Sequence, residues 1–161
     1  MKSKILLKVS NENDFLKYQN DYDGLYFSNP KNYIADIKDK EVFIDLINLS
    51  PTLALEVSKT APMNATFVVD DVIKAVFIKS ANENSKISYY LENYHESLLP
   101  LIKANGFDVT VKYTALAPER IEKFHKIGAK VNGATLSRLD ETQVLDFWNT
   151  DYITIIPEIK P

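Results

Sequence analysis

Asp45 is the residue whose surroundings point most directly to chemistry. It interrupts an otherwise apolar run, Val42-Phe43-Ile44-Asp45-Leu46-Ile47, which has the composition of a buried strand. A carboxylate in such a run is costly to bury unless it is paired, hydrogen-bonded or bound to a metal ion. At a strand end, Asp45 could therefore act as a general base or as a metal ligand. The alternative is a carboxylate that caps a neighbouring helix or emerges at the edge of the sheet.

Other polar residues follow other strand-like runs. In open α/β sheets, ligands bind beyond the carboxyl ends of the strands, where loops and helix N-termini converge. The residues that we predict to form a catalytic set there are Asp45, Asn48 and Asp140. Those predicted to bind a ligand are Ser80, Asn82 and Arg138. This hypothesis requires Asp45, Asn48, Ser80 and Asp140 to meet in one pocket.

Arg138 has a second interpretation. The chain has only two arginines, Arg120 and Arg138, among its 19 basic residues. The planar guanidinium binds carboxylates and phosphates through two parallel hydrogen bonds. Because Arg138 stands two residues before Asp140, it could either contact an anion or form a structural pair with that carboxylate. We favour the structural pair.

Two patterns raise the possibility of a metal site. Both histidines lie in Glu-x-x-His sequences, Glu92 to His95 and Glu122 to His125, and two such pairs build di-iron sites in four-helix bundles. Here the strand-like run 107–113 stands where another ligand-bearing helix would be needed, so we favour exposed helix faces. Asp70-Asp71 could bind a hard cation, but aspartates are also common in turns. We therefore predict no metal site and leave any cofactor open.

Several well-known motifs are absent. The sequence has no Gly-x-Gly-x-x-Gly, no phosphate-binding Gly-x-x-x-x-Gly-Lys-Ser/Thr and no Gly-x-Ser-x-Gly, and it has only four glycines. These absences argue against standard nucleotide-dependent enzymes. The chain also lacks cysteine, which excludes disulfides, thiolate zinc sites and cysteine nucleophiles.

The composition is that of an ordinary globular domain. The 161 residues are 45% hydrophobic and 25% charged, with a net charge of −3, and this length favours one domain, residues 1–161. Such a charge gives no basic footprint for nucleic acid. The apolar run Ile5-Leu6-Leu7 is too short for a signal-peptide core, and no stretch approaches the length of a membrane span. We expect a cytoplasmic location.

Short apolar runs alternate with segments of helical spacing. The runs that we predict as strands are 5–9, 24–27, 41–47, 65–69, 72–78, 107–113, 131–136 and 152–156. Helices are predicted after Asn11 or Asn13, after Ser50-Pro51, from about Asn84 to Asn105, after Ala117-Pro118, and after Asp140 as the N-cap.

Alternating strands and helices predict an α/β fold with a mostly parallel sheet. We rank an open, twisted sheet with helices on its faces first, and a closed β/α barrel second, because that barrel normally needs about 250 residues. Only Asp70-Asp71 separates the runs 65–69 and 72–78, so we predict a hairpin or one bent strand there.

The run Val42–Asn48 resembles the Asp-x-x-Asn strand end of the NYN/PIN-like nucleases. The order that follows it, including Gly106-Phe107-Asp108-Val109 and then Lys130-Val131-Asn132, is also similar to that family. Asn132 stands where the family would have a metal-binding carboxylate, and Ile155-Ile156-Pro157-Glu158 replaces its last acidic motif. The resemblance therefore implies a nuclease-like domain whose metal site is incomplete.

Without a coherent catalytic set, we predict a non-catalytic binding or protein-interaction module. Tyrosines beyond those that the core needs could form a surface for a protein partner or for self-association, and those concerned are Tyr18, Tyr22, Tyr26, Tyr33, Tyr89 and Tyr113. A small-molecule ligand could also bind at the strand ends. The alternative function is a small metal-dependent hydrolase or phosphoesterase centred on Asp45.

Overall fold

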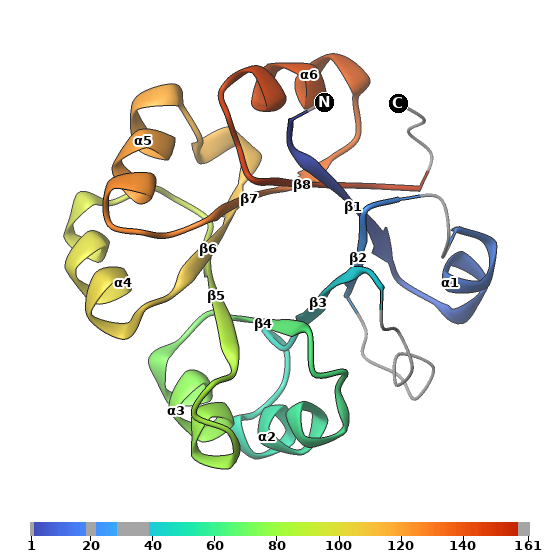
Figure 1. Cartoon of the computed structure of the whole chain (residues 1–161), viewed down its shortest axis with the longest axis vertical. Helices are drawn as coiled ribbons and strands as arrows, with labels where there is room; N and C mark the ends of the chain where they lie inside the picture. The colour runs from blue at the N-terminus through green and yellow to red at the C-terminus, as the bar shows by residue number, and fades with distance from the viewer. Residues whose placement is uncertain (1, 19–21, 29–38, 158–161) are drawn as a thin grey trace.

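Eight parallel strands form a closed barrel, with helices arranged around it (Figure 1). The computed structural model describes residues 2–18, 22–28 and 39–157. The strands are β1 (Lys4–Val9), β2 (Gly24–Phe27), β3 (Glu41–Asp45), β4 (Ala65–Val69), β5 (Lys86–Leu91), β6 (Asp108–Lys112), β7 (Val131–Leu136) and β8 (Tyr152–Ile155). Each strand pairs with the next along the chain, and β8 pairs with β1 to close the ring.

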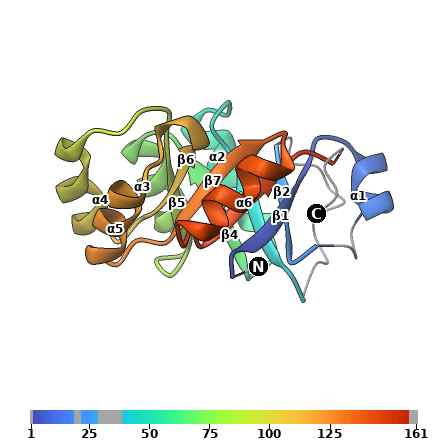
Figure 2. The same ribbon diagram turned by 90° about the horizontal axis from the view of Figure 1, so that it is seen from above.

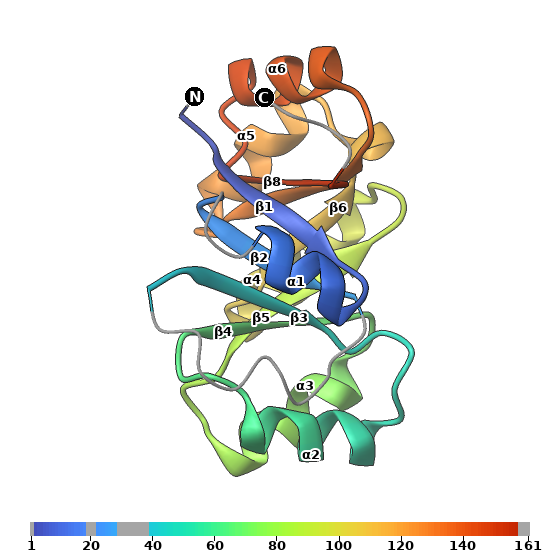
Figure 3. The same cartoon turned by 90° about the vertical axis from the view of Figure 1, so that its right-hand side faces the viewer.

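The helices lie outside the ring and are short. They are α1 (Glu12–Tyr18), α2 (Pro51–Thr60), α3 (Val72–Ala81), α4 (Leu99–Asn105), α5 (Pro118–Lys126) and α6 (Leu139–Phe147). Two single turns of 3-10 helix precede α4 and α5, namely η2 (Glu96–Leu98) and η3 (Tyr113–Ala115). Seen from the side, α2 and α3 pack together at one margin and α6 lies at the opposite margin (Figure 3), with α4 and α5 far from α1 (Figure 2).

Local sequence explains where α2 and α3 begin. The Ser50 side chain accepts a hydrogen bond from the amide of Leu53, and Pro51 occupies the first turn, where it needs no donor. The Asp71 side chain likewise accepts from the amide of Lys74 at 2.7 Å. These caps satisfy amides that a helix leaves unpaired at its start.

Side chains alternate between the inside and the outside of the barrel, as the two-residue period of a strand requires. On β1, for example, Ile5, Leu7 and Val9 pack outward in the main core, whereas Leu6 lies in a separate inner cluster. That inner cluster contains Leu6, Tyr26, Phe43, Val68 and Tyr152. The remaining interior is polar, with a hydrogen-bonded series from Ser88 through Thr110 and Asn132 to Thr154.

The α/β class and the parallel sheet are confirmed, and the arrangement is the barrel that we ranked second. We ranked the open sheet first on chain length alone, and that ranking was wrong. The six described helices have only 7 to 10 residues each. Such short crossovers let 161 residues complete a ring that usually takes about 250.

Two element assignments are wrong. One predicted strand is a helix and one observed strand was not predicted, so the number of predicted strands still equals the number observed. The run 72–78 is helix α3, because Asp71 caps it and Ala75 and Ile78 bury one face; there is no hairpin at Asp70-Asp71. Conversely, residues 86–91 form β5, although we expected one helix from Asn84 to Asn105. Asp140 is also not a cap: it lies in the first turn of α6, after the N-cap residue Arg138.

None of the helices within the described residues combines the length and the apolar character that a membrane span requires.

Candidate functional site

A cavity of about 380 Å³ opens at the carboxyl ends of the strands. Its walls combine cations, carboxylates, tyrosines and small polar groups. The lining residues are Lys8, Tyr26, Asp45, Ile47, Asn48, Tyr90, Glu92, Lys112, Tyr113, Ala134 and Thr135. The volume lies within the range of small-molecule sites, and the carboxyl end is where β/α barrels carry their ligands.

Asp45, the last residue of β3, lies in the wall of this cavity with both carboxylate oxygens hydrogen-bonded. Oδ1 accepts from the amide of Ile47 at 2.9 Å, and Oδ2 accepts from the Tyr26 hydroxyl at 2.7 Å. Burial raises the pKa of Asp45 above its ordinary value, although these two bonds and the charge of Lys8 act in the opposite direction. Burial and the nearby Asp45 charge also raise the pKa of Tyr26 well above normal.

Two lysines bring positive charge to the same cavity from β1 and β6. Lys112 Nζ lies 3.9 Å from Glu92 Oε1, and both side chains are about half exposed or more, so water screens this pair. For Lys8, no carboxylate of the described residues lies within ion-pair distance of Nζ. Lys8 is therefore a cation available to an anionic ligand.

The structure brings together two of the four residues that we expected to converge. Asp45 and Asn48 both line the cavity. Arg138 and Asp140 instead bind each other, through contacts of 3.1 and 2.7 Å, with both side chains largely exposed. That geometry is the structural pair that we favoured, and neither residue lines the cavity.

Ser80 and Asn82 lie away from Asp45 because the segment before them is a helix. A helix that follows a parallel strand runs back toward the amino ends of the strands, so the end of α3 lies at the other end of the barrel from the cavity. The Ser80 hydroxyl donates to the carbonyl of Phe77 at 2.5 Å. Asn82 lines a different cavity, beside Ala65 and Lys86 at the starts of β4 and β5. The predicted convergence of these two residues with Asp45 is wrong.

The described residues contain no group of three histidine or carboxylate side chains that could hold a metal ion. His125 Nε2 lies 2.7 Å from Asp151 Oδ2 at the opposite end of the barrel. Asp70 and Asp71 both contact the ammonium of Lys74. Asn132, which marked the nuclease resemblance, is buried inside the barrel and accepts a hydrogen bond from Thr154. A metal-dependent hydrolase centred on Asp45 therefore has no ligand set in the part of the chain that the structure describes.

None of the described tyrosines that we proposed as a partner surface is fully exposed. Tyr26 is buried, Tyr18, Tyr22, Tyr89 and Tyr113 are half-buried against the core, and Tyr33 lies outside the described residues. A protein partner or self-association stays a prediction.

Sequence reasoning missed Lys8, Lys112 and Tyr90, and it assigned Tyr26 and Tyr113 to a partner surface instead of this cavity. Lys8 and Lys112 each lie near the end of an apolar strand, in the same inward register as the buried residues Leu6 and Thr110 two positions earlier. That register becomes meaningful only when the ring is known to be closed, because closure turns one face of every strand toward a shared interior.

Comparison with protein-family models gives no match, and none is found among curated proteins. Solved structures do share the fold. A glycerol uptake operon antiterminator-related protein from Thermotoga maritima is similar, with a TM-score of 0.64 and 15% identity, over 96% of this chain and 95% of that one. An Oleispira antarctica phosphodiesterase in complex with the product sn-glycerol-3-phosphate has a TM-score of 0.62 and 12% identity, over 72% of this chain and 51% of that one.

A glycerophosphodiester phosphodiesterase from Parabacteroides distasonis has a TM-score of 0.60 and 14% identity, over 73% of this chain and 54% of that one. The chain spans about half the length of the phosphodiesterases that it matches, between 47% and 55% for four of them. At such low identities, these similarities establish the β/α barrel fold alone.

Proposed function

We propose that this protein binds a small anionic molecule that carries hydroxyl groups, such as a phosphorylated polyol, in the cavity at the carboxyl ends of the strands. The observation that carries this proposal is the presence of Lys8 and Lys112 in one cavity, with no carboxylate of the described residues in ion-pair contact with Lys8. An ammonium group binds phosphate or carboxylate oxygens through charge-assisted hydrogen bonds.

The other walls suit the hydroxylated part of such a ligand. The Asp45 carboxylate accepts hydrogen bonds, the Asn48 amide donates and accepts, and the Thr135 hydroxyl does both. Tyr90 and Tyr113 add aromatic surface against the carbon skeleton. Two neighbours in fold support the choice of probe: the Oleispira antarctica phosphodiesterase was solved with sn-glycerol-3-phosphate, and the Thermotoga maritima protein is related to a glycerol uptake operon antiterminator.

Isothermal titration with sn-glycerol-3-phosphate tests the proposal, with 3-phosphoglycerate, glycerol and inorganic phosphate as comparison ligands. We expect sn-glycerol-3-phosphate and 3-phosphoglycerate to bind, and glycerol, which carries no anionic group, not to bind. Lys8→Met should weaken binding by roughly tenfold or more, which corresponds to one lost charged contact. Lys126→Met, on the exposed face of α5, is the matched control and should leave affinity unchanged. Absence of binding to both phosphorylated compounds, or equal affinity in Lys8→Met, would contradict the proposal.

Asp45 supports a second candidate function, acid–base catalysis on a bound phosphorylated hydroxycarbonyl compound. A carboxyl group whose pKa is raised by burial is a better proton acceptor than an ordinary aspartate. Asp45 would take a proton from the carbon next to the carbonyl. The electron pair of that C–H bond would form the carbon–carbon double bond of an enolate, and the π pair of the carbonyl would move to its oxygen. A cavity lysine would stabilise this enolate until the proton returns to carbon.

Proton exchange with solvent tests the second candidate without knowledge of the final product. Dihydroxyacetone phosphate is incubated with the protein in D₂O, and loss of its C–H signal is followed by NMR. The parent protein should exchange this proton, and Asp45→Asn should bind the compound without exchanging it. Binding by the parent protein without exchange would exclude the catalytic role and leave the binding function intact.

A further inference from the structure

Lys74, in the first turn of α3, is a charged residue with almost no exposed surface. Its relative exposure is 6%, and a lysine is rarely so buried unless its charge is paired. The ammonium donates to the backbone carbonyl of Ile47 at 2.5 Å and to Asp70 Oδ1 at 2.8 Å, with Asp71 Oδ2 at 3.8 Å. These acceptors belong to two segments, the loop after β3 and the turn before α3.

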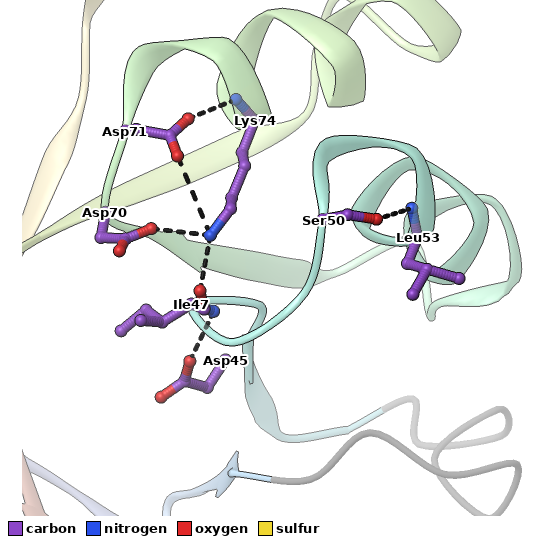
Figure 4. Close-up of polar contacts among 7 residues, drawn as sticks. All are labelled: Asp45, Ile47, Ser50, Leu53, Asp70, Asp71 and Lys74. Carbon is purple, nitrogen blue, oxygen red and sulfur yellow. Dashed lines mark hydrogen bonds and ion pairs between the residues drawn. The ribbon is translucent and has the colours of Figure 1, made fainter.

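The peptide groups of Ile47 connect Lys74 to the candidate site. The amide N–H of Ile47 donates to Asp45, and its carbonyl accepts from Lys74, so the same residue is held from both sides (Figure 4). Ile47 and the next residue, Asn48, both line the cavity, whereas Lys74 is not among the lining residues. Hydrogen bonds therefore link Asp45 in the cavity wall, through the backbone of Ile47, to the buried ammonium of Lys74 behind that wall.

We propose that Lys74 is a positioning residue of the ligand site, which fixes the loop carrying Ile47 and Asn48 and thereby orients the Asp45 carboxylate without touching the ligand. This inference rests on the proposed function for its effect on affinity. Two further consequences, one for the pKa of Asp45 and one for the Ile47 amide, can be measured without any ligand.

The first consequence is electrostatic. Burial is the main cause of the raised pKa of Asp45, the hydrogen bonds from Ile47 and Tyr26 and the charge of Lys8 lower this pKa, and the charge of Asp70 adds a small further increase. Lys74 neutralises Asp70 at 2.8 Å. Removal of the ammonium would leave Asp70 unpaired and loosen the Ile47 amide, and both changes act to raise the pKa of Asp45 further. A residue that serves only to pack α3 would not produce this shift.

The second consequence concerns the Ile47 amide. In the parent protein this amide is hydrogen-bonded to Asp45, and the carbonyl of the same residue is held by Lys74. If Lys74 fixes the loop, loss of its ammonium should speed hydrogen exchange at Ile47.

The variants are Lys74→Met, Lys74→Arg and the control Ser50→Ala. Methionine keeps much of the side-chain volume without the charge, and arginine retains the charge. Ser50→Ala removes the cap of α2 at the end of the same loop and leaves the contacts of Lys74 intact. Asp70 and Asp71 are each partly exposed, so water can hydrate them in Lys74→Met and the fold should persist.

Three measurements decide the proposal: affinity for sn-glycerol-3-phosphate, the Asp45 pKa from carboxyl ¹³C titration, and exchange of the Ile47 amide. We expect Lys74→Met to weaken binding by roughly tenfold, to raise the Asp45 pKa and to speed Ile47 exchange. Lys74→Arg should keep the affinity, the Asp45 pKa and the Ile47 exchange rate close to those of the parent protein. Ser50→Ala should lower the stability of α2 and leave these three quantities unchanged.

Unchanged affinity in Lys74→Met, or equal weakening in Ser50→Ala, would overturn the positioning role. If the parent protein does not bind the probe, the proposed function fails, and the two ligand-free measurements then decide the inference. An unchanged Asp45 pKa together with unchanged Ile47 exchange would overturn it in that case as well.

Discussion

The two halves of the barrel interior are filled in opposite ways. On the side of β1 to β4, the inward side chains include Leu6, Tyr26, Phe43 and Val68, and Tyr152 of β8 completes the cluster. The Phe43 ring lies 6.4 Å from that of Tyr26 and 5.0 Å from that of Tyr152. On the side of β5 to β8, a hydrogen-bonded series of small polar side chains takes the place of these rings.

Each half satisfies a different physical requirement. Ser88 and Thr110 hydroxyls lie 2.7 Å apart, and Thr154 donates to the Asn132 amide oxygen at 2.9 Å. One such bond contributes about 0.5–1.5 kcal/mol net, whereas a fully buried large apolar side chain contributes about 1.5–3 kcal/mol. The apolar half therefore supplies more stability. The polar half supplies directional contacts, which favour one register between neighbouring strands.

The comparison predicts the largest loss in the apolar half. Phe43→Ala removes a buried ring and leaves a cavity inside the barrel, so we expect the free energy of unfolding to fall by about 3–5 kcal/mol. Urea denaturation measures this change. Phe147→Ala is the matched control, because Phe147 is 83% exposed on α6 and should change stability by less than about 0.5 kcal/mol. Equal losses at the two positions would remove the distinction between interior and surface rings.

A smaller loss is expected in the polar half. Thr154→Val keeps the shape of the side chain but leaves the Asn132 amide oxygen without its donor, and should cost about 1–3 kcal/mol. Adding Asn132→Leu removes the orphaned group as well, so the double variant should recover part of the loss, since two apolar partners need no hydrogen bond.

Denaturation of both single variants and the double variant gives the coupling energy. Thr60→Val, at the exposed end of α2, controls for the substitution itself. If the losses of unfolding free energy in the two single variants are additive in the double variant, Asn132 and Thr154 fill space independently and do not stabilise the fold as a hydrogen-bonded pair.

Residue composition decided which parts of the fold the sequence could predict. Strands 24–27, 65–69 and 131–136 were predicted with their observed bounds. The first two are mostly apolar or β-branched, and the third keeps Val131, Thr135 and Leu136 despite Asn132 and Gly133 within it. The strand Lys86–Leu91 was missed because its inward residues, Ser88 and Tyr90, are polar and its outward ones continue a helical spacing. Helix α3 was mistaken for a strand because its exposed positions, Ile73 and Val76, are also β-branched.

For the candidate site, the sequence predicted residues that depend on one strand alone. Asp45 and Asn48 follow from a carboxylate at the end of an apolar run, and both line the cavity. Lys8 and Lys112 depend on closure of the ring, which brings β1 and β6 to one interior. Ser80 and Asn82 were misplaced by the same error that turned α3 into a strand. Site residues that follow from a single strand could be predicted, whereas residues brought together by closure of the ring could not.

The smallest expected effect concerns the pH dependence of stability, which the apolar half creates at Asp45. Tyr26 and its neighbours help to bury this carboxyl, and burial raises its folded-state pKa above the ordinary value of 3.8. The folded state therefore holds the proton more tightly than the unfolded state. The resulting stabilisation is fully present below the unfolded pKa and is lost as pH rises through the raised folded pKa.

Asp45→Asn removes this titration while keeping a side chain that can bond to both Ile47 and Tyr26. Its stability relative to the parent protein should therefore rise as pH increases above the ordinary pKa of 3.8 and through the raised folded-state pKa, and then stay constant. Urea denaturation of both proteins across this range measures the difference, in which the other carboxyl groups cancel. A difference that falls with pH would mean that hydrogen bonds and the Lys8 charge outweigh burial.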